Sequence, residues 1–248
     1  MRCTLRPTSS VRPRPTGHLV SGNDDTPVDG VYRFGQLYKS NSPDGSLDFF
    51  HNTCLVRRLD GATGFGLFRG THPADGERRS ANNVFVDVTP SIAAGSGYVT
   101  AYLPPPDFRG PTDGNCYVRV GGPPRPLLRH LRFDQRPGAA FDNLSKYRDS
   151  AHFEASQVGY PPGFEHNGLE EAAPFLSLAA DGTPQDGDDL RLTATSPARE
   201  HGIDPSGVGI VDPFAAPGPW HMGCYPPGDT GGLNVGVDGR RRFPTNPG

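Results

Sequence analysis

The sequence predicts an all-β fold in which short strands are separated by turns and arranged as a repeat. Amphipathic helical periodicity is nearly absent. Apolar runs of about four to eight residues lie between clusters of Gly, Pro, Asn and Asp, which is the usual pattern of strands and turns. An asparagine also recurs ahead of apolar residues, at Asn52, Asn83 and Asn115, with spacings of 31 and 32 residues. Repeats with periods of about 20–50 residues are typical of solenoids.

The composition indicates a loop-rich folded protein. The chain has 248 residues, of which 33 are Gly and 28 are Pro, while 14 Phe and 8 Tyr can fill a core. A formal net charge of −3 gives no reason to expect nucleic acid as a partner. No segment approaches the roughly 20 apolar residues of a membrane-spanning helix, so no membrane span is expected. The four cysteines form no CxxC pair, so neither a zinc ribbon nor a redox motif is predicted.

Residues 1–30 are interpreted as a flexible arm or an incomplete first repeat unit. Their first 20 residues are basic and rich in Pro, and they lack the apolar core of about 7–15 residues that a secretory signal needs. The chain is also interpreted as a C-terminal portion of a longer protein, in which case Met1 is not the natural start.

Residues 31–140 are predicted to form the repeating strands. The apolar segments that predict them are 31–38, 46–56, 64–70, 82–89, 97–103, 115–121 and 126–133. Residues 141–248 are richer in Gly- and Pro-containing loops and are predicted to pack as a cap on the strands. A solenoid needs such a cap because its terminal strands would otherwise expose unpaired backbone groups.

Several segments resemble those of a known family. "LDFFHNTCLV" at 47–56, "ANNVFV" at 81–86 and "DGNCYVR" at 113–119 look like successive rungs of a right-handed parallel β-helix of the pectate-lyase-like type. "DDLRLTATSPAREHGI" at 188–203 and "WHMGCYPPG" at 220–228 resemble the C-terminal signature of these proteins. The resemblance covers roughly residues 46–228, and it implies a single-stranded parallel solenoid with an irregular C-terminal cap.

This fold would explain the recurring asparagine. Rungs of such a solenoid lie about 4.8 Å apart, so residues at equal positions stack. We therefore expect Asn52, Asn83 and Asn115 to form a ladder of amide hydrogen bonds at one corner. An apolar stack on one face is expected two positions later, at Cys54, Phe85 and Tyr117.

The resemblance also implies a function. Members of the family bind polysaccharides, and many cleave them as lyases, with an Arg or Lys base and often Ca²⁺, or as hydrolases with paired carboxylates. We therefore expect a monomeric protein of the extracellular space or cell envelope that recognises a polysaccharide and, in its complete form, cleaves it. The alternative is a non-catalytic surface β-helix that binds glycan or serves only as a structure.

The catalytic candidates lie in the segment "LLRHLRFD". Its polar residues are Arg129, His130, Arg132 and Asp134, and side-chain alternation on a strand would place the last three on one face. A histidine beside an acid can transfer protons near neutral pH. The alternative interpretation is an exposed polar strand without a catalytic role.

The substrate-binding candidates are two pairs. Asp87 and Arg119 occupy equal positions, four residues after Asn83 and Asn115, so they either form an ion pair between rungs or line a sugar-binding groove. Glu165 and His166 lie in "GFEHN", where they either belong to an exposed loop or reach over a groove. No metal-binding motif is present, and Ca²⁺ is implied only by the resemblance.

Overall fold

The computed structural model describes the strands and helices of the chain together with the turns that join some of them. The residues described are 19–23, 38–40, 47–57, 68–70, 78–92, 94, 100–103, 112–130, 140–148, 165–171, 175–178, 189–209 and 218–223. Most of the elements are strands, and the helices are short, so the fold is all-β with parallel sheets. No helix in these ranges is long and apolar enough to cross a membrane.

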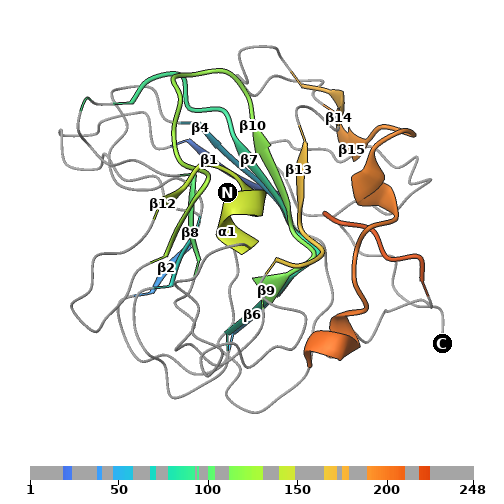
Figure 1. Cartoon of the computed structure of the whole chain (residues 1–248). Coiled ribbons are helices and arrows are strands. Elements are labelled where there is room, and N and C mark those ends of the chain that lie inside the picture. The colour runs from blue at the N-terminus through green and yellow to red at the C-terminus, as the bar shows by residue number, and fades with distance from the viewer. Residues whose placement is uncertain are drawn as a thin grey trace.

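Three sheets contain the repeating strands (Figure 1). The first sheet has the order β1 (Leu19–Asn23), β4 (Thr53–Arg57), β7 (Val84–Asp87), β10 (Cys116–Arg119) and β13 (Leu169–Glu171). The second contains β2 (Tyr38–Ser40), β5 (Phe68–Gly70), β8 (Ala101–Leu103), β11 (Leu128–His130) and β12 (Ala140–Phe141). The third contains β3 (Leu47–Phe50), β6 (Arg78–Ala81) and β9 (Thr112–Asp113). The chain visits the first, second and third sheet in turn, and we call one such circuit a coil.

The register along the first sheet gives the length of each coil. Leu19, Thr53, Val84, Cys116 and Leu169 are consecutive register partners, separated by 34, 31, 32 and 53 residues. The strand β1 lies within the segment 1–30 that the sequence indicated as an arm or incomplete unit. Three coils therefore have similar lengths, whereas the last interval is much longer.

The interval of 53 residues between Cys116 and Leu169 contains a strand that runs antiparallel to its neighbour. The strand β12 pairs with β11 in antiparallel orientation, and the helix α1 (Leu144–Arg148) follows it. Figure 1 shows α1 between the first and second sheets, and its residues Leu144 and Tyr147 are buried. The Tyr147 ring meets Phe141 edge to face, with centroids 5.2 Å apart. We call α1 and residues 165–171, which include β13, the cap.

The C-terminal elements cover one face of the first sheet. They are the antiparallel pair β14 (Phe175–Ser177) and β15 (Asp189–Leu192), and the 3₁₀ helices η1 (Pro197–Arg199) and η2 (Pro205–Val208). Valines 84, 86 and 118 of the first sheet form a buried apolar cluster with residues of these elements, namely Phe175, Leu190, Leu192, Ala198 and Met222. On the third sheet, Val208 packs on Ala81.

The Ser-Pro-Ala phrase of the sequence starts η1. The Ser196 hydroxyl accepts a hydrogen bond from Ala198 N, and Pro197 occupies the first helical position, where no donor is required. The Glu171 carboxylate of β13 accepts from both Ser196 Oγ and Ala198 N. This contact joins the cap to the C-terminal segment.

Side-chain alternation sends a second set of residues to the opposite, inner face of the first sheet. Cys54, Phe85 and Tyr117 are register partners on consecutive strands, and all three are buried. The rings of Phe85 and Tyr117 stack with centroids 5.4 Å apart. Cys54 and Cys116 are both buried free thiols.

Candidate functional site

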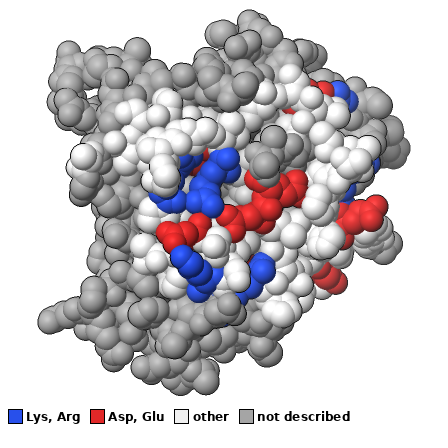
Figure 2. Space-filling model, turned by 45° about the horizontal axis from the view of Figure 1, so that its top comes forward, with Lys and Arg blue, Asp and Glu red and all other residues white. Residues whose placement is uncertain are grey.

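Charged side chains gather side by side in the middle of one face of the molecule, as Figure 2 shows. At the surface of the cap, Lys146 of α1 pairs with Asp142, and both side chains are largely exposed. Arg119 of β10 pairs with Glu170 of β13 at 2.8 Å, with the side chains 28% and 30% exposed. The second Glu170 oxygen accepts from Leu144 N at 2.9 Å, so this carboxylate ties the start of α1 to the sheet.

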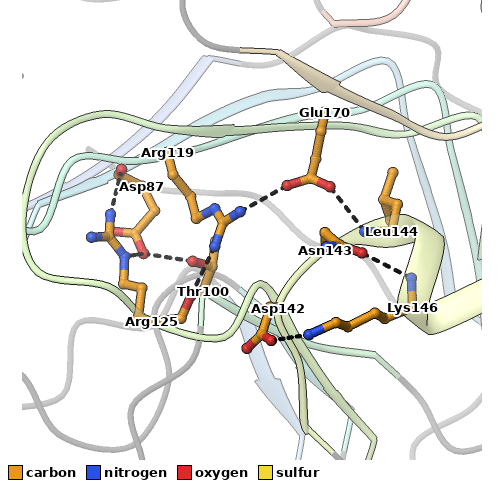
Figure 3. Close-up of polar contacts among 9 residues, drawn as sticks. All are labelled: Asp87, Thr100, Arg119, Arg125, Asp142, Asn143, Leu144, Lys146 and Glu170. Carbon is orange, nitrogen blue, oxygen red and sulfur yellow. Dashed lines mark hydrogen bonds and ion pairs between the residues drawn. The ribbon is translucent and has the colours of Figure 1, made fainter.

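Beneath these pairs lies a buried ion pair, Asp87 with Arg125 (Figure 3). Asp87 Oδ2 accepts from Arg125 Nε and from Thr100 Oγ1, both at 2.9 Å. Its Oδ1 accepts from Thr89 N at 3.0 Å. Asp87 is completely buried, and the Arg125 side chain is only 3% exposed. Because Thr100 and Arg125 precede β8 and β11, this carboxylate joins the first sheet to the second.

The loop before β11 is shaped to hold Arg125. The guanidinium donates to the Gly121, Pro123 and Asp87 carbonyls at 3.0–3.2 Å. Gly122 has a φ of +74°, and a Cβ there would lie 2.3 Å from the Thr89 carbonyl oxygen, so only glycine fits. All the polar groups of this pair thus have partners, which the burial of two charges requires.

This arrangement corrects the pairing expected for Asp87 and Arg119. The two residues are register partners, as their equal positions predicted. However, the buried partner of Asp87 is Arg125, and Arg119 pairs with Glu170. Asp87 has no exposed surface for a sugar, whereas Arg119 is partly exposed at the cap.

The recurring asparagines form a column of amide hydrogen bonds. Asn52 Nδ2 donates to Asn83 Oδ1 at 2.9 Å, and Asn83 Nδ2 donates to Asn115 Oδ1 at 2.8 Å. The backbone N–H groups of Asn52 and Asn83 donate to the same two oxygens, at 3.0 and 2.9 Å. All three residues are buried. The column therefore belongs to the structure of the corner and offers no surface to a ligand.

The residue before each asparagine explains the corner. His51, Asn82 and Gly114 have φ values of 51°, 56° and 66° and so turn the chain from the third sheet to the first. Glycine and asparagine tolerate this left-handed conformation. His51 is also buried, and burial lowers its pKa to about 4. Its ring lies 4.9 Å from that of His221 in the C-terminal segment.

Glu165 ends the column in place of a fourth asparagine. Its Oε1 accepts from Asn115 Nδ2 and Tyr117 Oη, both at 2.7 Å, and its Oε2 accepts from Asn115 N at 3.2 Å. Its φ is 52°, and the residue is completely buried. The exposed-loop interpretation of Glu165 is therefore wrong, because the residue is completely buried, whereas its sugar-binding role stays a prediction. The neighbouring His166 is exposed.

Burial also changes the acidity of Glu165. Removal from water raises its pKa to about 8, and the nearby Asp113 carboxylate acts in the same direction. The hydrogen bonds from Asn115 and Tyr117 oppose the rise. Burial and Glu165 together raise the pKa values of Tyr117 and Tyr147 well above the ordinary value. Glu165 is thus the described carboxyl group with the most perturbed environment.

The catalytic candidates lie in or beyond β11. Arg129 and His130 belong to this strand and are register partners of Tyr102 and Leu103. Arg132 and Asp134 lie outside the described residues. The side-chain arrangement expected for these four residues therefore stays a prediction.

The second sheet carries a pattern that sequence reasoning missed. Lys39 pairs in register with Arg69, Arg69 with Tyr102, and Tyr102 with Arg129. We call these four positions the basic row. The signal is present in the sequence as the triplets "YKS", "FRG", "AYL" and "LRH", but each is too short to align without the neighbouring strands.

Within the described ranges, no three His, Cys, Asp or Glu side chains lie close enough together to hold a metal ion. The buried Asp87 and Glu165 are occupied by hydrogen bonds from the protein, so neither provides a ligand for Ca²⁺. The described residues therefore do not fit the calcium-binding arrangement that the family resemblance implies.

The chain matches no protein-family model, no curated protein and no solved structure.

Proposed function

We propose that the protein is a right-handed parallel β-helix that binds a polysaccharide along the outer face of its second sheet. The fold part of this proposal rests on the order of the strands. Consecutive coils place parallel strands next to one another in all three sheets, at intervals of 34, 31 and 32 residues along the first. Crossovers between parallel strands of one sheet are right-handed in about 98% of proteins, which is the basis for the proposed hand.

The choice of face follows from what covers the other two sheets. The C-terminal elements pack on the outer face of the first sheet through Phe175, Leu192 and Met222. The 3₁₀ helix η2 packs on the third sheet through Val208. The second sheet is therefore the best candidate for a ligand-binding surface.

The basic row is the observation that carries the binding proposal. Adjacent strands lie about 4.8 Å apart, so the three cations and one tyrosine extend over about 14 Å. The four positions are register partners on adjacent strands, so they share one face of the second sheet. Such a row suits an extended chain with carboxylate or sulfate groups, and an aromatic ring at Tyr102 can stack on a sugar.

The described part of the site favours binding without cleavage. A glycosidase needs two carboxyl groups that reach the substrate, whereas Asp87 and Glu165 are buried in structural hydrogen bonds. Cleavage would then depend on the segment from Arg129 to Asp134, with Asp134 as the first acid to replace. A surface β-helix that binds glycan outside the cell is consistent with this proposal.

Binding is tested on the full chain with an acidic polyuronate and a neutral glucan of similar length, by calorimetry at two salt concentrations. We expect the polyuronate to bind more tightly than the neutral glucan. Its affinity should fall at the higher salt concentration, because salt screens exposed charges. The variant Arg69→Ala/Arg129→Ala should lose at least about tenfold in affinity, equivalent to about 1.4 kcal/mol. The control Lys146→Ala removes an exposed cation of the cap and should bind as the wild type does.

Two outcomes would overturn the proposal. Absence of binding to either polymer would exclude the function, and equal affinities of the row variant and the control would exclude the site. The same mixtures, incubated with and without calcium, report cleavage through new reducing ends and through the ultraviolet absorbance of unsaturated uronates. Reducing ends with this absorbance would indicate a lyase, and reducing ends alone a hydrolase.

A further inference from the structure

Glu165 connects the cap to the last complete coil. Its backbone N–H donates to Thr112 O of the third sheet at 2.7 Å, while its carboxyl group receives the donors of Asn115 and Tyr117. On the cap side, Arg148 of α1 donates to Glu165 O at 2.5 Å and also to Gly168 O. Residues from the coil bind the carboxyl group and backbone N–H of Glu165, and Arg148 of the cap binds its backbone oxygen, so the two parts meet at this one residue.

Among the described residues around Glu165, no cation is paired with its carboxyl group. Arg148 binds backbone oxygens of Glu165 and Gly168. Asp113, which binds Asn167 N and Nδ2 at 2.7 and 2.8 Å, adds a like charge. Tyr117 and Tyr147 are neutral and buried, as is the thiol of Cys116, whose pKa burial and the neighbouring glutamates raise. The carboxyl group thus has only neutral donors, in contrast to the pair of Asp87 and Arg125.

Both protonation states can be accommodated, but at different cost. The ionised form accepts the three hydrogen bonds described, at the expense of an uncompensated buried charge. The neutral form removes this charge, and its own hydrogen can be donated to Tyr117 Oη, 2.7 Å away, because a hydroxyl group both donates and accepts. The neutral form is therefore the one that favours a closed cap.

We propose that Glu165 is a proton-operated latch, which holds the cap on β10 when it is protonated and weakens that contact when it loses its proton. The physical basis is linkage between proton binding and opening. In the closed state the pKa of Glu165 is about 8, above the ordinary value of 4.5 that it regains when solvated. The latch is therefore strongest below about pH 4.5, weakens as the pH rises and reaches its minimum near pH 8.

Opening would expose specific groups of the last coil. Leu169 N donates to Asn115 O at 2.8 Å, and β13 covers the edge of β10. Without the cap, the edge of β10 and the buried Tyr117 would become accessible. The prediction is therefore local to β10 and the cap.

Hydrogen–deuterium exchange of the full chain, corrected for intrinsic rates, tests the latch between about pH 5 and pH 9. In peptides that cover 112–119, 144–148 and 165–171, we expect the opening constant to rise close to tenfold per pH unit up to about pH 8 and then to level off. Peptides that cover β4 and β7 should not show this rise. Glu165→Gln should abolish it, because glutamine does not titrate.

The matched control is Glu170→Gln, which replaces a glutamate of β13 whose carboxylate accepts from Leu144 N at the start of α1. This variant should retain the pH dependence. A rise that persists in Glu165→Gln, or one of equal size in all strands, would overturn the proposal. As a second variant, Asp113→Asn removes the neighbouring like charge and should move the plateau to lower pH. An unchanged plateau would also contradict the latch.

Discussion

Asp87 and Glu165 are two completely buried carboxyl groups with opposite surroundings. Asp87 lies against the Arg125 guanidinium, whose remaining donors bind backbone carbonyls. Among the described residues, the Glu165 carboxyl group receives only neutral donors, and the nearby Asp113 carboxylate has the same sign. One buried acid has a fixed counter-charge, and the other does not.

The difference indicates what determines whether a buried acid responds to pH. Burial raises the pKa of any carboxyl group, and a paired cation can offset that rise. One arginine, six residues beyond Arg119 in the loop before β11, gives the buried Asp87 carboxylate a paired opposite charge. No described cation is paired with the Glu165 carboxyl group, and burial raises its pKa to about 8, so its charge can change near neutral pH.

The largest effect is expected for Arg125→Met, which leaves Asp87 buried without its paired cation. Removal of one partner of a buried ion pair costs about 3–5 kcal/mol, and we expect a loss of this size in the free energy of unfolding at neutral pH. The measurement is urea denaturation, with Arg119→Met as the control, for which about 1 kcal/mol is expected because its pair is partly exposed. Equal losses in the two variants would show that burial of the Asp87 pair is not the deciding factor.

Asn83→Ala tests the contribution of buried hydrogen bonds at a residue that carries no charge. Asn83 gives its amide protons to Asn115 and Ser80 and receives two donors from Asn52. Alanine would leave these buried groups without a partner, which should lower the free energy of unfolding by about 1–3 kcal/mol. The loss should be the same at pH values on both sides of the Glu165 transition. An unchanged melting temperature would argue against a stabilising role for the column.

The pH dependence of the free energy of unfolding distinguishes the contribution of Glu165 from that of His51. The pKa of Glu165 is raised from 4.5 to about 8, so its contribution to stability is lost as the pH rises through this range. The pKa of His51 is lowered from 6.5 to about 4, so its contribution is lost as the pH falls between these values. The two slopes oppose each other below about pH 6.5, and only the loss due to Glu165 remains above it.

We therefore expect the wild type to lose about 2 kcal/mol between about pH 6.5 and pH 8, since one proton is worth about 1.4 kcal/mol per pH unit. Glu165→Gln should remove this loss and reveal the opposite slope of His51 at lower pH. The measurement is urea denaturation over a pH series. A wild-type slope that persists in the variant would assign it to another group.

The smallest effect is expected at the surface of the cap. Lys146 and Asp142 are largely exposed, and the pKa of Asp142 is lowered by its hydrogen bond with Lys146. Solvent screens such pairs, so Lys146→Ala should give no measurable change in melting temperature. A change as large as that of Arg125→Met would mean that burial does not separate the two kinds of pair.

The repeat could be predicted from the sequence because the same residue type recurs at a nearly constant spacing, which places these residues in register on neighbouring strands. Asn52, Asn83 and Asn115 are separated by 31 and 32 residues, and strand alternation then assigns Phe85 and Tyr117 to one face. Asp87 and Arg119 were likewise assigned to equal positions, as their register shows. The local pattern could not reveal their partners, because Arg125 lies in a loop whose path depends on the packing of the second sheet.

The place of Glu165 at the end of the asparagine column was not predicted, for a related reason. Its segment follows an interval of 53 residues between register partners, so no spacing aligns it with the column. A carboxyl group also replaces the expected amide, and the nearby Asn167 looks like the next member although its side chain binds Asp113. The basic row was missed because the triplets that carry it lie in strands of three residues.

The near-equal coils have a consequence for how such a chain can change in length. Between β4 and β10 every coil presents an asparagine to its neighbours, and the residues that differ from this pattern lie in the cap. Duplication of one segment of 31 or 32 residues would add a member to the amide column and a position to the basic row, while the same cap would still fit the last strand. Evolution could therefore adjust the length of the proposed ligand-binding face in steps of about 4.8 Å, without redesign of either end.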